Sequence, residues 1–187
     1  MGFTTRQIHA GVTPDPTTGS ILTPIYQSTT YVQSSVDEYL AKGYSYSRSG
    51  NPTVKALEDK LADLEGGHAC ATFGTGMSAI TCTMLAFLNA GDHVIVSDVA
   101  YGGTYRFCTK VLSRFGVDIT FADTSKPEEV KAAVRENTRM LLTETPANPT
   151  MKCSDIAALS EIAQSAGIVH AVDNTFLTPY YCRPLEL

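Results

Sequence analysis

Several features are missing from this sequence of 187 residues. Its apolar runs reach only about five residues, far short of the roughly 20 that span a bilayer. No apolar stretch follows residues 1–6 either, so we expect neither a membrane span nor a secretory signal. Acidic residues outnumber basic ones by 19 to 14, and the net charge of −5 argues against nucleic acid or an anionic membrane as a partner.

A pairing pattern of cysteines is missing as well. The chain has five, an odd number without close pairing: Cys70, Cys82, Cys108, Cys153 and Cys182. This usage predicts free thiols in a reducing cytoplasm and neither a disulfide framework nor a zinc site. Each cysteine is explained as a small core residue. We therefore expect a cytoplasmic protein without a metal centre.

Residues 1–50 differ in composition from residues 51–187. The first segment is rich in proline, serine and threonine and has no sustained helical or strand period, which predicts an extended arm that lies against another subunit. The second begins with a helix that Asn51 caps, with Pro52 in its first turn and Gly66-Gly67 at its end. With 43% hydrophobic and 18% charged residues, the chain can bury the core of one domain.

From residue 69 onward, short apolar segments alternate with helical patterns. We expect strands at 69–73, 93–97, 117–121, 140–143 and 168–172, and helices at 77–88, 104–113, 127–134 and 155–166. The third of these helices would begin with a capping box formed by Ser125 and Glu128, and the fourth would begin at Ser154. Strands that alternate with helices of this length pair in parallel. The sequence thus predicts an α/β fold with a doubly wound, mostly parallel sheet.

Two segments could bind a phosphate group. Residues 73–78, Phe-Gly-Thr-Gly-Met-Ser, follow a predicted strand and open a helix, where glycines permit close approach and free N–H groups favour an anion. A tight turn would explain these glycines equally well, because the string is neither a Walker loop nor a complete dinucleotide fingerprint. Tyr46 and Arg48 would point the same way in an extended segment and could clamp a phosphate. A solvated arginine in a flexible arm is the alternative.

Two loops after predicted strands carry further polar or aromatic side chains. Tyr101 precedes Gly102-Gly103 and could stack on a planar ring, while Arg106 on the next helix could reach a carboxylate. Asn148 lies between Pro146 and Pro149 and offers both a donor and an acceptor. Interior packing for the tyrosine and a structural turn for the proline loop are the alternatives.

Asp173 ends an apolar run, at the strand end where open α/β sheets bind their ligands. There it could pair with a cationic ring nitrogen, a metal or a sugar hydroxyl, or it could cap a turn. A phosphate cradle, a stacking tyrosine, an asparagine and this aspartate together describe a site for pyridoxal phosphate. In such a site the aspartate keeps the pyridine nitrogen protonated, so that the ring serves as an electron sink.

Three strings make a resemblance specific: Tyr-Ser-Arg-Ser-Gly-Asn-Pro-Thr at 46–53, Glu-Thr-Pro-Ala-Asn-Pro-Thr at 144–150, and Val-Asp-Asn-Thr-Phe at 172–176. Through them the chain resembles the Cys/Met-metabolism family of pyridoxal-phosphate enzymes, over roughly the first half of a member. The resemblance implies the aspartate-aminotransferase-like fold of type I. Residues 1–50 would form its N-terminal arm and residues 51–187 an incomplete cofactor-binding domain, without the small C-terminal domain.

The resemblance implies a shared phosphate site. Gly76 and Met77 would give backbone N–H groups to the cofactor phosphate, and Tyr46 and Arg48 would reach the phosphate in the neighbouring subunit's site. A homodimer or homotetramer with sites shared between subunits follows from this arrangement.

The resemblance also assigns roles around the cofactor ring and the substrate. Tyr101 would stack on the ring and act as the catalytic residue in proton transfer. Asn148 would contact the 3′-oxygen side of the cofactor and the substrate. Asp173 would bind the ring nitrogen, supported by Thr175. Arg106 would bind a distal carboxylate of the substrate.

Positions within these motifs favour particular members of the family. Gly103 with Arg106 is similar to cystathionine γ-lyases and γ-synthases, whereas methionine γ-lyases usually have cysteine at the first position and lack the arginine. Ser45 departs from the acidic residue that those cystathionine enzymes often carry. We expect γ-elimination or γ-replacement on sulfur amino acids, of the cystathionine γ-lyase or γ-synthase type. A methionine γ-lyase or an O-acylhomoserine sulfhydrylase is the alternative.

No lysine follows Lys152. Family members hold the cofactor through a lysine in a Ser-x-Thr-Lys string beyond the position of Asp173, and Lys152 matches no such motif. We therefore expect that the chain alone cannot complete the reaction and is the N-terminal half of an enzyme. A non-catalytic half that needs a complementing chain is a second hypothesis. A nucleotide-binding module is a third, which the incomplete fingerprint disfavours.

Overall fold

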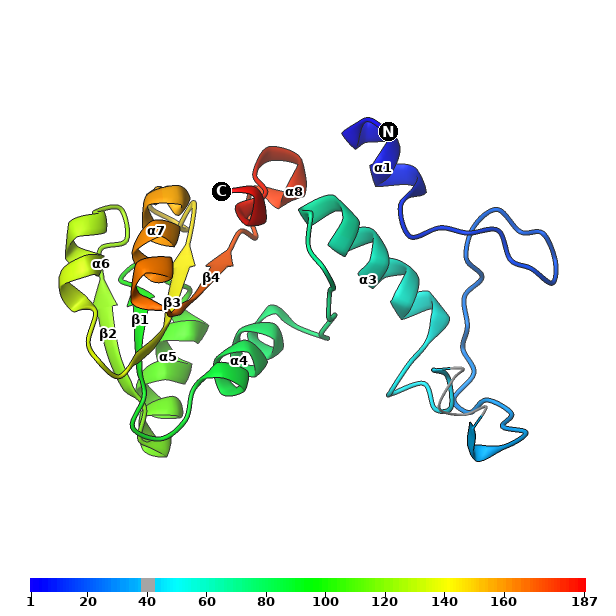
Figure 1. The fold of residues 1–187 in the computed structure, drawn as a ribbon, viewed down its shortest axis with the longest axis horizontal. Coiled ribbons are helices and arrows are strands. Elements are labelled where there is room, and N and C mark those ends of the chain that lie inside the picture. Colours follow the sequence, from blue (N-terminus) through cyan, green and yellow to red (C-terminus); the bar gives the residue numbers. More distant parts are fainter. Residues whose placement is uncertain (38–42) are drawn as a thin grey trace. The chain divides into compact units, whose positions relative to one another are not determined.

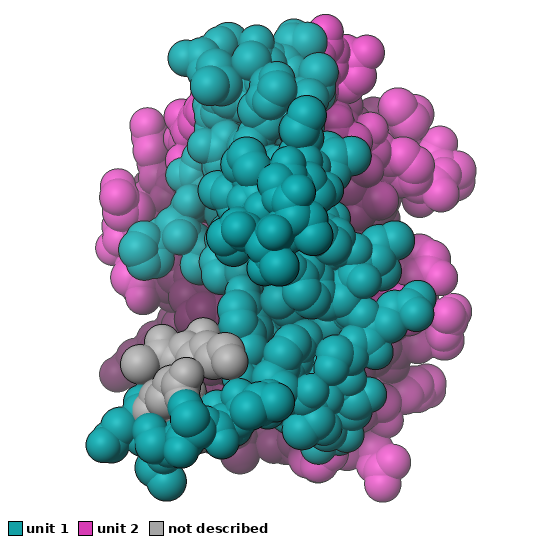
Figure 2. Space-filling model, turned by 90° about the vertical axis from the view of Figure 1, so that its right-hand side faces the viewer, with its two compact units in different colours: residues 1–72 teal, residues 73–187 magenta. Residues whose placement is uncertain are grey.

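The computed structural model describes residues 1–37 and 43–187. These fall into two compact units, residues 1–72 and residues 73–187, which Figure 2 distinguishes by colour. Each unit has its own internal packing. The assignment of residues 1–50 as an intersubunit arm stays a prediction.

The second unit is built on a parallel sheet of four strands: β1 (His93–Ser97), β2 (Asp118–Ala122), β3 (Thr138–Glu144) and β4 (Val169–Asp173). Their order is β2-β1-β3-β4, and every pair is parallel. All five residues of β1 are buried, as expected of a central strand with both faces covered. From β2 the chain crosses over β1 to β3, so the winding direction changes between β1 and β3. Ligands bind at such switch points in open α/β sheets.

Helices pack on both faces of this sheet, as the ribbon in Figure 1 shows. One core cluster joins Val94 and Val96 to side chains from α4 (Gly76–Phe87) and α5 (Gly102–Lys110). The other joins Ile95 to side chains from α6 (Pro127–Ala133) and α7 (Ile156–Ala166). Successive β1 residues thus face opposite layers, which follows from the two-residue period of a strand. The predicted α/β, doubly wound parallel fold is confirmed.

The first unit contains α1 (Phe3–His9) and α3 (Pro52–Glu65). Asn51 caps α3 as predicted, since its side chain accepts a hydrogen bond from the Thr53 N–H at 2.9 Å. Gly66 ends the helix in the left-handed conformation, at φ 71°. The guanidinium of Arg6 pairs with Asp63 at 2.7 Å and joins α1 to α3. A short helix therefore lies in the segment that the sequence predicted to be extended.

The strand predicted at 69–73 is wrong. No residue of this segment lies in a strand, and both the N–H and the hydroxyl of Thr72 donate to Glu58 on α3. The backbone donor that a sheet would use is therefore satisfied within the first unit. An apolar segment needs a neighbouring strand to pair with as well as its own pattern, and within residues 1–37 and 43–187 no strand pairs with this segment.

Two predicted helix caps are also wrong. Ser125 donates to Asp123 at 2.6 Å and forms no box with Glu128, and α6 begins after Lys126. The cap of α7 is Asp155, which accepts from the Ala158 N–H, and not Ser154.

Several boundaries differ from the predicted ones. Helix α5 begins two residues earlier than predicted and is followed by a 3-10 turn, η1 (Leu112–Phe115). The sequence did not predict α8 (Thr178–Tyr181) or the 3-10 turn η2 (Pro184–Glu186). None of the described helices is long and apolar enough to cross a membrane.

Candidate functional site

Three predicted site residues meet around one carboxylate at the carboxyl edge of the sheet. Glu144, the last residue of β3, accepts a 2.6 Å hydrogen bond from the Tyr101 N–H at Oε2 and a 3.4 Å bond from the Asn148 N–H at Oε1. The sheet register also places Glu144 directly opposite Asp173 on β4. Tyr101 follows β1 and Asn148 follows β3, so the group spans the switch point between these strands.

Glu144 itself is the residue that sequence reasoning missed. It lies within the Glu-Thr-Pro-Ala-Asn-Pro-Thr string, but no role was predicted for it. Its side chain is buried, with the residue 7% exposed. Burial raises the pKa of this carboxyl, the N–H donors of Tyr101 and Asn148 lower it, and the negative charge of Asp173 raises it. The signal available in the sequence was a carboxylate at the end of a buried strand, the same signal that singled out Asp173.

Asp173 is oriented by Thr175, whose predicted role near the cofactor ring stays a prediction. The N–H of Thr175 donates to Asp173 Oδ1 at 3.1 Å, and the Thr175 hydroxyl donates to the same oxygen. Among the described residues, no donor reaches Oδ2. The side chain is therefore held by one oxygen and presents the other for an external donor, such as a protonated ring nitrogen.

Tyr101 has an exposed ring above a tightly packed turn. The residue is 55% exposed, and its N–H is held by Glu144. A Cβ added at Gly103 would lie 2.6 Å from Tyr101 Cε1 and 2.7 Å from Met77 Sδ. Glycine at this position thus lets the tyrosine ring and the start of α4 come together. The ring face can stack on a planar ligand without first leaving the core.

The start of α4 has the features of an anion cradle. Thr75 caps this helix of 12 residues by accepting from the Ser78 N–H at 3.1 Å. A Cβ at Gly74 or Gly76 would meet nothing within 4 Å, so the backbone there is open. Within the described residues, no acceptor is found for the N–H groups of Gly76 and Met77. Such N–H groups with the helix dipole favour a phosphate.

Tyr46 and Arg48 come together in the first unit. The Arg48 guanidinium carbon lies 5.0 Å from the centre of the Tyr46 ring, a cation–π contact. They meet through a turn and not in an extended segment, because Ser49 N–H and Gly50 N–H both donate to the Tyr46 carbonyl. Their predicted role in a phosphate site of a neighbouring subunit stays a prediction.

Arg106 lies on α5, and its Nη1 would be 3.4 Å from a Cβ added at Gly102. The guanidinium therefore folds back over the helix start that follows Tyr101. This places a positive charge beside Gly102, and the predicted contact of Arg106 with a substrate carboxylate stays a prediction.

Lys152 is engaged in ion pairs. Its Nζ lies 2.6 Å from Asp123 and 3.3 Å from Asp98. The hydrogen bond to Asp123 raises the pKa of Lys152, which keeps the amine protonated, whereas a nucleophilic lysine needs a lowered pKa. The structure thus supports the prediction that Lys152 is not the cofactor lysine. Its side chain instead ties the loop that carries Asn148 to the ends of β1 and β2.

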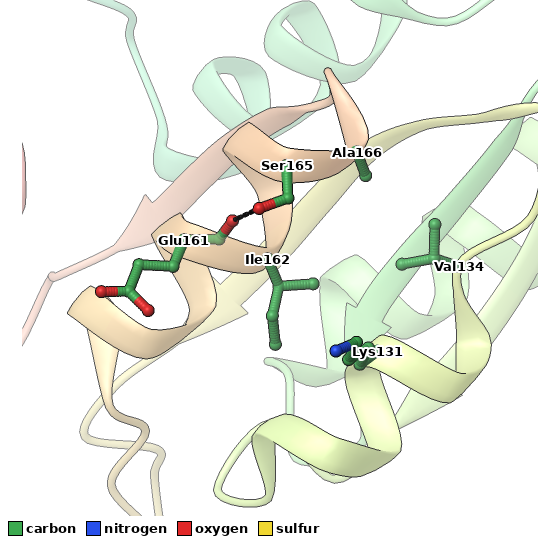
Figure 3. A pocket seen from close by; sticks show the side chains of 6 residues that line it. All are labelled: Lys131, Val134, Glu161, Ile162, Ser165 and Ala166. Atoms are coloured by element: carbon green, nitrogen blue, oxygen red, sulfur yellow. Dashed lines mark hydrogen bonds between the residues drawn. The ribbon is translucent and has the colours of Figure 1, made fainter.

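A hollow of about 470 Å³ lies elsewhere in the second unit. Figure 3 shows it between α6 and α7, lined by Lys131, Val134, Glu161, Ile162, Ser165 and Ala166. These residues belong to the C-terminal turns of the two helices, which in a parallel α/β unit lie toward the amino ends of the strands. The hollow therefore faces away from the carboxyl edge that carries Glu144 and Asp173.

Comparison with known proteins gives consistent matches over this chain. A family profile described as Cys/Met metabolism PLP-dependent enzyme matches residues 4–187. The chain is 49% identical to a cystathionine γ-lyase from Bacillus subtilis, over 98% of this chain and 48% of the relative. It is 46% identical to a probable cystathionine γ-synthase from Herpetosiphon aurantiacus, over 100% of this chain and 57% of the relative.

The fold is similar to solved structures as well. The crystal structure of metB from Corynebacterium glutamicum aligns with a TM-score of 0.95 and 46% identity, covering 100% of this chain and 48% of that one. The chain therefore spans about half the length of the relatives that it matches.

Proposed function

The chain belongs to the Cys/Met metabolism PLP-dependent enzymes, and we propose that it is the N-terminal part of one that acts on sulfur amino acids by γ-elimination or γ-replacement. The observation that carries this proposal is the group formed by Tyr101, Asn148, Glu144 and Asp173 at the switch point of the sheet. It joins an exposed aromatic face, an amide and an oriented carboxylate at one edge, as a pyridine ring with polar substituents requires.

We infer that the residues of this chain hold pyridoxal phosphate from three sides. The N–H groups of Gly76 and Met77 bind the phosphate, the Tyr101 ring stacks on the pyridine face, and Asp173 Oδ2 accepts from the ring nitrogen. When bound, this cofactor supplies an electron sink for the carbon atoms of the substrate. The negative charge of Asp173 keeps the proton on the ring nitrogen, which that sink requires. Tyr101 would also move a proton at the reacting substrate.

We propose that Arg106 selects the substrate class. An arginine fork binds a carboxylate through two parallel hydrogen bonds, so it suits a substrate with a second, distal carboxylate such as cystathionine. The identities of 49% to a γ-lyase and 46% to a γ-synthase are too similar to choose between elimination and replacement. Product analysis separates the two reactions. Elimination releases ammonia and an α-keto acid without an added thiol, and replacement consumes the thiol.

We propose a homodimer or homotetramer in which the first unit contacts a second copy. The segment from Ile21 to Val36 exposes several large apolar side chains, with Ile21, Leu22, Ile25 and Val32 each at least 68% exposed. Contact with a second copy would remove these apolar side chains from water, and exposed apolar patches of this kind mark protein–protein interaction sites. Light scattering tests this assembly, and a mass of one chain would contradict it. A cytoplasmic location belongs to the same proposal, and it is supported by five cysteines of which none forms a disulfide. Cys82 and Cys153 are exposed, so the prediction that each cysteine is a core residue is wrong for these two.

We propose further that the lysine that attaches the cofactor is supplied by additional sequence of the same gene product. The intact mass of the expressed protein tests this, because this chain is 20.1 kDa and spans 48% of the B. subtilis relative. A mass close to twice 20.1 kDa supports it. Co-purification with a second polypeptide that carries Ser-x-Thr-Lys would instead support a half that needs a complementing chain.

Cofactor uptake tests the function directly. The purified full gene product should carry a visible absorbance band that a carbonyl trap such as hydroxylamine removes. A colourless protein that takes up no pyridoxal phosphate would contradict the proposal.

A further inference from the structure

We propose that Glu144 is a positioning residue, whose carboxylate holds the Tyr101 and Asn148 loops in register with Asp173 at the cofactor ring. This inference rests on the proposed function, because the residues that it positions are those proposed to hold pyridoxal phosphate. It assigns Glu144 no contact with substrate or cofactor. Glu144 would act through the backbone of two loops.

The geometry requires both oxygens of the carboxylate. Oε2 accepts from Tyr101 and Oε1 from Asn148, and the two donors belong to loops that leave different strands. A carboxylate is an acceptor at both oxygens, whereas an amide or a protonated acid turns one of them into a donor. A glutamine or a protonated glutamic acid at this position would set a donor against one N–H, and a side chain without oxygen atoms would leave both N–H groups without this acceptor. The site therefore selects glutamate by chemistry as well as by size.

The contacts also explain why the exposed Tyr101 ring has a defined place. Tyr101 is 55% exposed, its ring packs on one side against Gly103, and no side chain caps the start of α5, so the N–H of Tyr101 needs an anchor from elsewhere. The 2.6 Å bond from its N–H to a buried carboxylate supplies that anchor. Bonds to an ionised acceptor are shorter and stronger than neutral ones, so the turn before α5 is fixed at its backbone.

Glu144 also connects this turn to Asp173. The strand register opposes the two carboxylates, and the N–H of Thr145 donates to the Asp173 carbonyl at 3.1 Å. The residues that would lie at the ring face, at the 3′-oxygen and at the ring nitrogen are thus linked by three hydrogen bonds centred on residues 144 and 145. A displacement of Glu144 would move Tyr101 and Asn148 relative to Asp173.

Three substitutions of Glu144 separate the effect of its charge from the effect of its side-chain length. Glu144→Gln keeps the length but sets an amino group against one N–H, and the shorter bond to Tyr101 should keep the remaining oxygen. Glu144→Asp keeps both acceptors but withdraws them by one methylene, and Glu144→Ala removes them. Glu161→Gln makes the same charge change on the exposed face of α7 and serves as the matched control.

Hydrogen exchange of individual amides in the full gene product is the first readout. We expect Glu144→Gln to speed exchange at Asn148 about tenfold with a smaller change at Tyr101, and Glu144→Ala to speed both by about tenfold or more. The control should change neither amide. Unchanged exchange at both amides in Glu144→Ala would overturn the proposal.

The circular dichroism of bound pyridoxal phosphate is the second readout, because it reports ring orientation and is independent of turnover. We expect a reduced cofactor band in all three Glu144 variants at saturating cofactor. We also expect kcat to fall by a larger factor than KM changes. If exchange rises but the cofactor band is unchanged, Glu144 is structural and the proposal is overturned. If the wild-type protein binds no cofactor at all, the proposed function fails, whatever the amides show.

A pH titration of the wild type keeps the test decisive if the variants do not fold. The amide proton resonances of Tyr101 and Asn148 should shift with one common midpoint, that of Glu144. Asp173 on β4 is the charged group that acts on Glu144 across the strand pair. Burial raises the pKa of Glu144, so the midpoint should lie above that of an ordinary glutamate. Separate midpoints, or amides that do not titrate, would overturn the proposal.

Discussion

Glu144 and Asp173 stand opposite each other at the carboxyl ends of two paired strands, β3 and β4. One carboxylate is turned toward backbone N–H groups, and the other is held by Thr175 through a single oxygen. Two like charges at neighbouring strand ends disfavour each other unless each has its own donors. The two carboxylates therefore have different partners: Glu144 accepts from the N–H groups of two loops, and Asp173 keeps one oxygen for the ligand that we propose.

Gly103 is expected to control the position of the Tyr101 ring. In Gly103→Ala the added Cβ would fall 2.6 Å from Tyr101 Cε1 and 2.7 Å from Met77 Sδ, so the ring and the methionine must move. We expect a stability loss of about 1 kcal/mol, because both neighbours are flexible side chains, and a fall of roughly tenfold in pyridoxal-phosphate affinity. Fluorescence titration of the cofactor measures this affinity.

Gly102→Ala is the control for this substitution. Its Cβ would meet Arg106 Nη1 at 3.4 Å and would not come within 4 Å of Met77, so it lacks the close contact with Met77 that a Cβ at Gly103 would make. Equal affinity losses in the two variants would contradict the predicted role of Gly103.

Lys152 is expected to be structural. Lys152→Met should lower the melting temperature, because Asp123 and Asp98 lose the cation that lies between them. Lys126→Met serves as the comparison, since Lys126 is more exposed and also pairs with Asp123, at 3.4 Å. Its effect should be smaller.

Borohydride reduction tests the same residue chemically. After reduction of the cofactor-loaded protein and proteolysis, the peptide that contains Lys152 should carry no pyridoxyl group. A labelled Lys152 would mean that this protonated, paired amine is the attachment site after all.

His170 is expected to make the fold sensitive to acid. Burial lowers its pKa to about 4, and its ring nitrogens lie 3.0 Å from the hydroxyls of Thr143 and Ser160. The unfolded chain binds the proton at higher pH than the folded one does. Stability should therefore be fully present above about pH 6.5 and be lost progressively as the pH falls toward about 4, by at most about 3 kcal/mol. Urea unfolding across this range measures the loss.

His170→Gln should flatten this pH dependence while keeping polar contacts to one or both hydroxyls. An unchanged slope in the variant would assign the acid sensitivity to other groups.

The sequence predicted the central part of the fold well. The strand expected at 93–97 is β1 with the same bounds, because a short apolar run between polar turns has few alternatives to a buried strand. The segment at 69–73 has a similar pattern but forms no strand, since Thr72 bonds to Glu58 on α3 instead. That choice depends on a residue 14 positions earlier, which a local pattern does not contain.

The sequence points to individual residues of the candidate site but not to the hydrogen bonds that join them. Asp173 and Tyr101 were singled out because strand ends in α/β folds carry ligand-binding residues. Glu144 has the same position, yet its function depends on N–H groups 43 residues before it and four residues after it. The strand order β2-β1-β3-β4, which brings those groups together, is a property of the folded sheet.

The dissociation constant of pyridoxal phosphate for the wild-type gene product and for Asp173→Asn tests the central claim most directly. Asparagine keeps the size and an acceptor for Thr175 but removes the charge that would hold a proton on the ring nitrogen. We predict that the wild type binds the cofactor and that the variant binds it at least about tenfold more weakly, with a lower fraction of protonated ring in its absorbance spectrum. Equal dissociation constants and identical spectra would contradict the account.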